Sequence, residues 1–173
     1  MELPASEAEI LRTDLAVLEA VEAHIEPSNR WVSQLARKDG RAKLLASLPG
    51  IGDFFAVLLA VEIDEVKRFP RAQKLCAYAG LVPSTYASGG YVHHGCITKQ
   101  GNKWIRWACI EAVYPAIRKD PALAAIYERL KAAKGANVAK VAVAKRLLII
   151  AYRVLSEGRP YRPTNEQASL RKR

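Results

Sequence analysis

Apolar residues recur at helical spacing in the N-terminal part of the chain. Four of them lie four, three and seven positions apart: Leu11, Leu15, Leu18 and Ile25. Residues with this spacing share one face of an α-helix, and the pattern resembles the alternating apolar positions of a coiled coil. No proline interrupts the seam before Pro27, so we expect a coiled-coil arm over residues 1–36. An ordinary amphipathic helix packed on its own domain fits the same pattern, because only about three heptads are available.

The charge of the chain is divided unevenly. Residues 1–36 contain seven acidic and two basic residues, whereas residues 37–173 contain ten acidic and 25 basic residues. The first segment is therefore net negative, and the net charge of +10 for the whole chain arises from the excess of basic residues in the second segment. A strongly basic domain is typical of proteins that bind nucleic acid or an anionic membrane surface.

The composition predicts a folded, cytoplasmic protein. Half of the 173 residues are hydrophobic and a quarter are charged, which suits one or two compact domains. The three cysteines form no CxxC pair and fit a reducing compartment better than a disulfide-linked fold: Cys76, Cys96 and Cys109. No run of 18 apolar residues and no basic leader is present, so we expect no membrane association.

The segment after the arm has the outline of a helix-hairpin-helix. A short helix from Arg41 precedes the turn LPGIG at residues 48–52, and an apolar helix follows from Asp53. Gly50 and Gly52 permit a tight turn, and they leave the first amides of the second helix free to face a phosphate. Both glycines are therefore candidate nucleic-acid contacts.

Proline and glycine also delimit the later helices. We expect them over residues 70–79, 102–117, 121–133 and 137–155, with Pro70 in a first turn, Gly80 past an end, and Asp120-Pro121 as cap and first turn. The prediction is an all-α protein: a coiled-coil arm (1–36), a compact helical domain (41–158) and a basic flexible tail (159–173).

Residues 81–101 form the least regular segment. They contain four glycines and only weak alternation, which predicts a glycine-rich loop or a short hairpin. Ser88, followed by Gly89-Gly90, is either a nucleophile on an accessible turn or part of a turn signal, and composition favours the turn. The adjacent His93 and His94 have no second ligand cluster beyond Cys96, so a structural or phosphate-contacting role is favoured over a metal site.

The string from Lys99 to Trp107 places three further cations and two tryptophans at the start of a helix. Cations there oppose the helix dipole, and an anion at this point would compensate them. The candidate nucleic-acid contacts are Lys99, Asn102, Lys103 and Arg106. A solvated face with one tryptophan in the core is the alternative. The scattered carboxylates of the basic domain show no pattern that would hold two metal ions, so we predict no metal site.

Several of these strings together resemble one known family. They are LPGIG (48–52), RF (68–69), AYAGLVPS (77–84), SGG (88–90), TKQGNKWIRWA (98–108), KVAVAKRLLIIAYRVL (140–155) and GRPY (158–161). Over residues 44–161 their order and spacing resemble the C-terminal transposase domain of the insertion-sequence 110/116/902 family.

The resemblance implies a site-specific DNA recombinase that works as a tetramer guided by a structured bridge RNA. In such proteins an RNase-H-like domain carries a DEDD carboxylate set, a coiled-coil arm follows, and a helical domain supplies a catalytic serine. By position that serine is Ser88, whose hydroxyl would attack a DNA phosphodiester. The present sequence begins at the arm and lacks the DEDD acids, so we expect no cofactor in this chain and magnesium only with that other domain.

Two functions follow. The chain is the C-terminal domain of a transposase that binds DNA and guide RNA, self-associates through its arm and supplies Ser88, with strand transfer dependent on the missing domain. Alternatively it is a non-catalytic nucleic-acid-binding and dimerisation module, as a fragment or truncation with Ser88 inert. A ribosome-associated or repair-type helix-hairpin-helix protein fits the charge and LPGIG but leaves the other strings unexplained.

Overall fold

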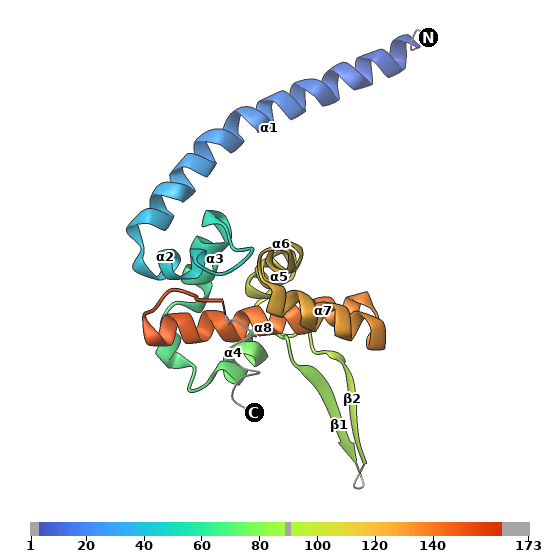
Figure 1. Ribbon diagram of the computed structural model, residues 1–173. Coiled ribbons are helices and arrows are strands. Elements are labelled where there is room, and N and C mark those ends of the chain that lie inside the picture. Colours follow the sequence, from blue (N-terminus) through green and yellow to red (C-terminus); the bar gives the residue numbers. More distant parts are fainter. Residues whose placement is uncertain (1–3, 89–90, 164–173) are drawn as a thin grey trace.

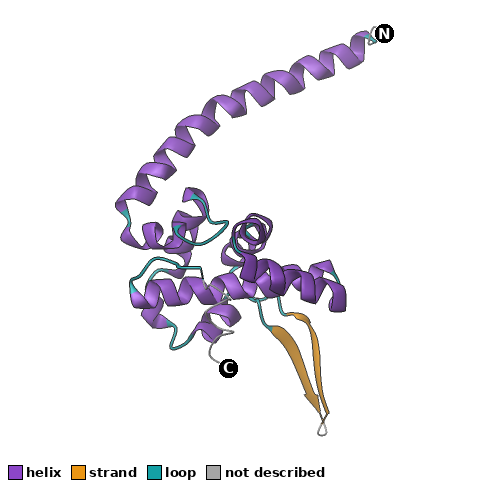
Figure 2. Cartoon of the chain, viewed as in Figure 1, coloured by secondary structure: helices purple, strands orange, loops and turns teal. Residues whose placement is uncertain are grey.

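A computed structural model describes the backbone of residues 4–88 and 91–163, and the side chains of that range except 85–88 and 91–96. The chain forms a helical domain from which a long helix and a β-hairpin project (Figure 1). Within the residues that the structure describes, Figure 2 shows strands in the hairpin alone, so the predicted helical class is confirmed. The elements, in chain order, are α1 (Ala5–Lys38), α2 (Gly40–Ala46), α3 (Asp53–Ile63), the 3-10 helix η1 (Val66–Arg68), α4 (Ala72–Tyr78), β1 (Pro83–Ser88), β2 (Tyr91–Ile97), α5 (Lys103–Glu111), α6 (Val113–Lys119), α7 (Pro121–Lys134) and α8 (Ala136–Glu157).

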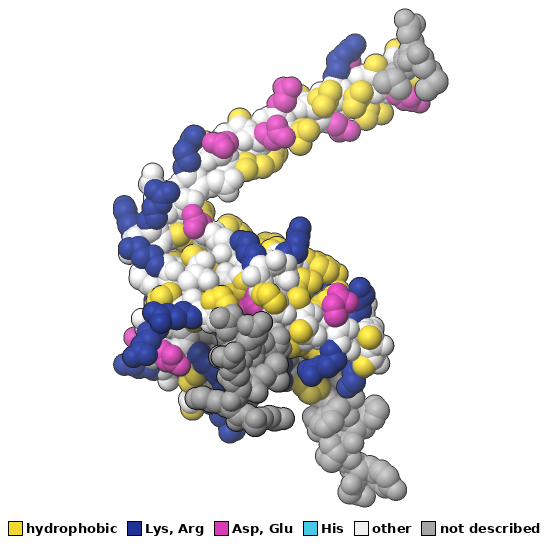
Figure 3. Space-filling view, in the orientation of Figure 1, with side chains coloured by type: hydrophobic (Ala, Val, Ile, Leu, Met, Phe, Trp, Pro, Cys, Tyr) yellow, Lys and Arg dark blue, Asp and Glu magenta, His cyan; other side chains and the backbone are white. Residues whose placement is uncertain are grey.

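The N-terminal helix α1 extends away from the domain as a curved arm (Figure 1). It continues through Pro27, which has no N–H to donate to the carbonyl of Ala23. Of its residues only Ala36 is buried, and the predicted seam is exposed along with further apolar side chains. Figure 3 shows these apolar side chains and the acidic ones on the surface of the arm. The alternative in which the helix packs along its own domain is therefore not what the structure shows.

Helix α8 is the centre of the domain. Its buried residues are Ala139, Val143, Ala144, Leu147, Leu148, Ala151 and Val154. Three of these are alanines, whose small side chains let neighbouring helices approach closely, and α2, α4, α5, α6 and α7 all pack on α8. The helix ends at Gly158, which adopts the left-handed conformation expected of a C-terminal glycine.

Two predicted helix boundaries were wrong. The helix expected over residues 102–117 is divided at Ala112 into α5 and α6. Pro115 explains the division, because it cannot donate to the carbonyl of Glu111 and its ring would clash with that carbonyl in a continuous helix. Pro70 does not occupy a first turn either: α4 begins at Ala72, after Phe69 has turned into the core.

Other boundary predictions are confirmed. Asp120 caps α7 through Oδ1, which accepts from the amides of Ala122 and Leu123 at 2.8 and 3.3 Å. Pro121 opens the helix, and Gly80 follows α4 with a φ of +68°. The first residues of the predicted tail, 159–163, instead lie against the domain: the amide of Tyr161 donates to Ser47 Oγ at 2.8 Å. Residues 164–173 lie outside the described part of the chain.

The irregular segment forms an antiparallel hairpin rather than an open loop. Ser88 pairs with Tyr91 at its outer end and Pro83 with Ile97 at its base, with a register shift between Pro83 and Thr85. The hairpin projects from the helical domain, and among the described segments its strands pair with no others than themselves (Figure 1). Its position is therefore set by how its two ends are anchored.

Candidate nucleic-acid interface

The base of the hairpin is held between the end of α4 and the start of α5. The amide of Leu81 donates to the carbonyl of Cys76, and the amide of Asn102 donates to the carbonyl of Tyr78, at 2.9 and 2.7 Å. Gly80 and Gly101 both have positive φ. A Cβ at Gly80 would meet the backbone of Lys99 and Gln100, and a Cβ at Gly101 would meet the backbone of Tyr78. The requirement for glycine at both positions is therefore steric: two backbone segments cross where no side chain fits.

Asn102 joins this base to helix α3. Its Oδ1 accepts from the amides of Trp104 and Ile105 at 2.9 and 3.0 Å and so caps α5. Its Nδ2 donates to Glu62 Oε2 at 2.5 Å. Both ends of the side-chain amide are thus engaged within the protein, and the role that the structure gives Asn102 is to position α5.

Arg106 also points inward to the hairpin base. Its Nη1 donates to the carbonyl of Ala79 at 2.8 Å, and the side chain is half-buried. This bond satisfies one of the last carbonyls of α4. Its guanidinium retains further N–H groups for an anion, since it has five in all.

Lys99 and Lys103 are the exposed cations of the predicted set. Lys99 lies in the turn before α5 with a φ of +54°, and Lys103 is the first residue of that helix. Lys103 Nζ lies 5.0 Å from the ring centroid of Trp104. Within the part of the chain whose side chains are described, neither lysine forms an ion pair, so both remain available to an anion.

Both tryptophans of this string are exposed, so the alternative with one tryptophan in the core is not what the structure shows. Trp104 and Trp107 retain 47% and 41% of their surface, and the neighbouring Phe54 retains 51%. The inward face of α5 is occupied by Ile105, Ala108 and Cys109, which leaves residues 104 and 107 on the opposite side.

These rings form one exposed cluster with the start of α3. The centroid of Trp107 lies 5.2 Å from that of Phe55, 6.2 Å from that of Phe54 and 6.0 Å from that of Trp104, all in edge-to-face geometry. The cluster joins the two helices and borders Lys103. Sequence reasoning noted the tryptophans but missed the phenylalanines that complete the cluster.

The two glycines of the turn between α2 and α3 have different environments. Gly50 has a φ of +80°, and a Cβ there would lie 2.5 Å from the carbonyl oxygen of Ala112 and 2.7 Å from the nitrogen of Ala116. Gly50 is therefore a packing position for α6. Gly52 is exposed with open space around it and precedes the first turn of α3, which has no side-chain cap.

Ser88 is the last residue of β1, at the hairpin end distant from the domain. Its side chain, those of His93 and His94, and both residues of Gly89-Gly90 lie outside the described part of the structure. Whether the Ser88 hydroxyl acts as a nucleophile stays a prediction.

The described residues form no metal centre, and the two described cysteines are buried. No group of three or more His, Cys, Asp or Glu side chains there is placed to hold a metal ion. Cys76 and Cys109 are free but buried, and burial raises the pKa of Cys109 to about 12, with a smaller contribution from Cys76. A thiol in this state is a poor nucleophile.

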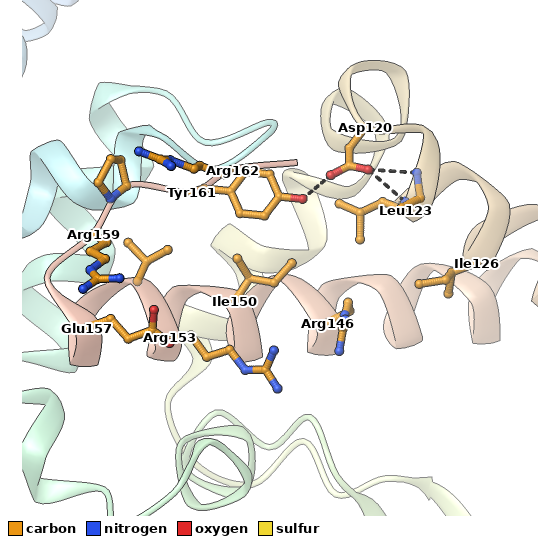
Figure 4. A pocket seen from close by; sticks show the side chains of 13 residues that line it. Asp120, Leu123, Ile126, Arg146, Ile150, Arg153, Glu157, Arg159, Tyr161 and Arg162 are labelled. Carbon is orange, nitrogen blue, oxygen red and sulfur yellow. Dashed lines mark hydrogen bonds between the residues drawn. The ribbon is translucent and has the colours of Figure 1, made fainter. Parts of the chain in front are cut away.

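A cavity of about 540 Å³ lies between α7, α8 and residues 159–162 (Figure 4). Four arginines line it: Arg146, Arg153, Arg159 and Arg162. Sequence reasoning did not single them out. The spacing of seven residues between Arg146 and Arg153 could have indicated that both lie on one face of α8.

None of the described helices is both long and apolar enough to span a membrane. The described residues form a basic helical domain with an exposed arm and a projecting hairpin. The family model described as the IS116/IS110/IS902 transposase family matches residues 42–128. The chain belongs to this transposase family.

Three curated relatives are similar to the chain. A probable family 20 transposase of Pseudomonas aeruginosa is 30% identical over 165 residues, which are 93% of this chain and 49% of the relative. A pilin gene-inverting protein of Moraxella bovis is 34% identical over 125 residues, or 70% of this chain and 38% of the relative. An IS110 insertion-element protein of Streptomyces coelicolor is 30% identical over 68% of this chain and 29% of its own length. The chain thus spans about half or less of the length of these relatives.

Proposed function

We propose that this chain is the serine-bearing C-terminal domain of a transposase or site-specific DNA recombinase. It binds DNA and a guide RNA and supplies Ser88 as the nucleophile for strand transfer. Family membership supports this proposal, and so does the name of the Moraxella relative, since gene inversion is a recombination reaction. The observation that carries it is the location of Ser88 at the outer end of a hairpin that projects from the domain.

The proposed step transfers a DNA phosphoryl group to serine. The Ser88 hydroxyl oxygen forms a bond to phosphorus and loses its proton, and the bond from phosphorus to the leaving sugar oxygen breaks. That oxygen takes up a proton and becomes a free sugar hydroxyl, and a phosphoserine links protein to DNA. Reaction of the phosphoserine with another sugar hydroxyl reverses the chemistry and joins a new strand. A projecting hairpin suits this step, because it brings a short side chain to a DNA strand without contact between the strand and the domain core.

The exposed lysines beside α5 and the open start of α3 are the proposed contacts to nucleic acid. Lys99 and Lys103 have no carboxylate partner among the described residues. The turn at residues 47–52 and the two helices around it act as a helix-hairpin-helix, in which the free amides after Gly52 face a phosphate. Gly50 acts there indirectly, because it lets the turn pack on α6.

The arm is proposed to self-associate as a coiled coil. Its apolar side chains are too numerous for a helix that remains in water: Ile10, Leu11, Leu15, Val17, Leu18, Val21 and Ile25 are all about half exposed. A second copy of the arm would cover them. The proposed organisation is an arm, a helical domain that binds nucleic acid, and a basic C-terminal segment.

The described residues do not fit a magnesium site, because no group of three candidate ligands occurs among them. The proposal therefore assigns no step in this chain to a metal. Magnesium belongs in the proposal to an RNase-H-like domain with DEDD carboxylates. The same observation favours the second candidate function, a nucleic-acid-binding and dimerisation module with no catalytic role.

Covalent adduct formation separates the two functions. The chain, joined or mixed with an RNase-H-like DEDD domain and supplied with guide RNA and magnesium, should form a protein–DNA adduct that survives denaturation. Ser88→Ala should abolish the adduct and leave DNA affinity within about threefold, since one exposed hydroxyl contributes little to binding. Ser156→Ala, an exposed serine on α8, is the matched control and should keep the adduct. If Ser88→Ala still formed the adduct in full, Ser88 would not be the nucleophile, and the nucleic-acid-binding and dimerisation module would be the function of this chain.

A further inference from the structure

The cavity between α7, α8 and residues 159–162 has a polar rim and an aliphatic wall. Arg146 and Arg153 extend from α8, whereas Arg159 and Arg162 extend from the segment that follows it (Figure 4). The aliphatic wall consists of Leu123, Ile126, Ile150 and Val154. The volume of about 540 Å³ is within the range typical of sites for small organic groups.

The four guanidiniums are not neutralised within the protein. In the described residues none of them takes part in an ion pair. Two acidic residues also line the cavity, Asp120 and Glu157. The Asp120 carboxylate is buried and already accepts from two amides of α7 and from the hydroxyl of Tyr161. The rim therefore keeps an excess of positive charge.

The wall of the cavity is held in place by the C-terminal segment. Tyr161 donates from its amide to Ser47 Oγ at 2.8 Å and from its hydroxyl to Asp120 Oδ2. These two bonds fix the chain direction after Gly158 and bring Arg159 and Arg162 to the same cavity as the arginines of α8. Arginines from two elements that line one cavity can bind the oxygens of phosphate groups.

We propose that this cavity binds an unpaired nucleotide of a nucleic-acid strand. The guanidiniums contact its phosphates, and the base lies against the aliphatic wall. A paired base is stacked inside a duplex and cannot enter a hollow, whereas an unstacked base in a single strand or an RNA loop can. The inference rests on the proposed function only in taking nucleic acid as the ligand. It adds a contact made by residues other than Lys99, Lys103 and Ser88, none of which lines the cavity.

Equilibrium binding of the full chain to labelled oligonucleotides tests this inference. The probes are a single-stranded DNA, a single-stranded RNA and a DNA duplex of the same sequence, measured by fluorescence anisotropy at several salt concentrations. For Arg146→Gln/Arg153→Gln we expect affinity for a single strand to fall about tenfold at moderate salt, and the slope of log affinity against log salt to decrease by about 1.4, since two phosphate contacts are lost. Duplex affinity should change by less than about threefold, because general phosphate contacts lie elsewhere.

The control variant is Arg129→Gln/Lys134→Gln, which removes the same charge from exposed positions of α7 that do not line the cavity. It should lower single-strand affinity much less than the cavity variant does. A larger effect on RNA than on single-stranded DNA assigns the site to a guide-RNA loop, and the reverse assigns it to an opened DNA strand.

Equal losses in the two variants, or a duplex affected as much as the single strands, would overturn the inference. A single strand with abasic positions supplies a further check, because it keeps the phosphates and removes the bases. Wild-type affinity unchanged by base removal would also overturn it. None of these binding measurements requires DNA cleavage. A negative result in the Ser88 adduct experiment would therefore not overturn the cavity proposal, and a negative result in the binding measurements would not overturn the role of Ser88.

Discussion

The hydroxyl of Tyr161 donates a hydrogen bond to the buried carboxylate of Asp120, 41 residues away. Asp120 is only 2% exposed and caps α7 with its other oxygen. One side chain thus fixes the start of a helix, and the C-terminal segment is fastened to it. The cavity with the four arginines depends on this connection.

Removal of the Tyr161 hydroxyl should destabilise the domain. In Tyr161→Phe one oxygen of Asp120 loses its partner in a buried position, so we expect the free energy of unfolding to fall by about 1–3 kcal/mol. Tyr152→Phe is the comparison, since it removes a bond of 3.0 Å to the carbonyl of Phe69, and it should cost about 0.5–1.5 kcal/mol. Urea titration followed by circular dichroism measures both. A smaller cost for Tyr161→Phe than for Tyr152→Phe would contradict the expected order.

The same pair predicts a pH dependence at high pH. Burial, and then the hydrogen bond and negative charge of Asp120, raise the pKa of Tyr161 to about 12 from 10.0. As the pH rises from about 10 to about 12 the unfolded chain loses this proton first, so stability falls across that range. Below pH 10 this contribution is complete. Urea titrations across the range should show a shallower decline for Tyr161→Phe than for the wild type, and identical slopes would contradict the assignment.

The two glycines of the α2–α3 turn should respond differently to alanine. Gly50→Ala places a Cβ against the backbone of Ala112 and Ala116 at a φ of +80°, so we expect a loss of more than about 2 kcal/mol. Gly52→Ala has open space and a φ of −94°, and its stability should change by less than about 1 kcal/mol. Thermal melting of the two variants tests the difference, and equal melting temperatures would contradict the packing role of Gly50.

Asn102 should contribute to the stability of the fold, in addition to lying next to the candidate nucleic-acid contacts Lys99 and Lys103. Asn102→Ala removes the cap of α5 and the bond to Glu62, so we expect a loss of about 1–2 kcal/mol. Asn102→Ser retains a capping oxygen and should recover part of that loss. Asn137→Ala, at an exposed position early in α8, serves as the control and should lie within about 0.5 kcal/mol of the wild type. Urea titrations in which Asn102→Ala matched this control would exclude the capping role.

The exposed seam of the arm predicts self-association. Sedimentation at tens of micromolar should show an oligomer for the full chain and a monomer for a chain that starts near Lys43, because an apolar seam is buried only against a partner. Leu15→Asp or Leu18→Asp should mimic the truncation. Ala20→Asp adds the same charge to the arm away from the seam and should leave the oligomer intact. A monomeric wild type would exclude the coiled coil.

Local patterns were enough to predict the order of helices, several of their ends and the exposed arm. Apolar spacing determines which residues share one face of a helix, and glycine, proline and Asp120 act on the backbone within a few residues of their own position. These signals need no information about distant parts of the chain. The break between α5 and α6 at Ala112 could also have been predicted from a local signal, because Pro115 acts on the helical turn that precedes it.

The relations between helices could be decided only by the tertiary structure. Spacing shows that Trp104 and Trp107 lie on one side of α5, but which side is buried depends on how α5 packs against α3 and α8. The close approach of α6 to Gly50 and the bond from Asn102 to Glu62 also join positions that are distant in sequence. The arginine-lined cavity exists because Tyr161 brings the last described residues back to Asp120. The sequence by itself determined which segments are helical, and packing between those segments decided which side chains meet.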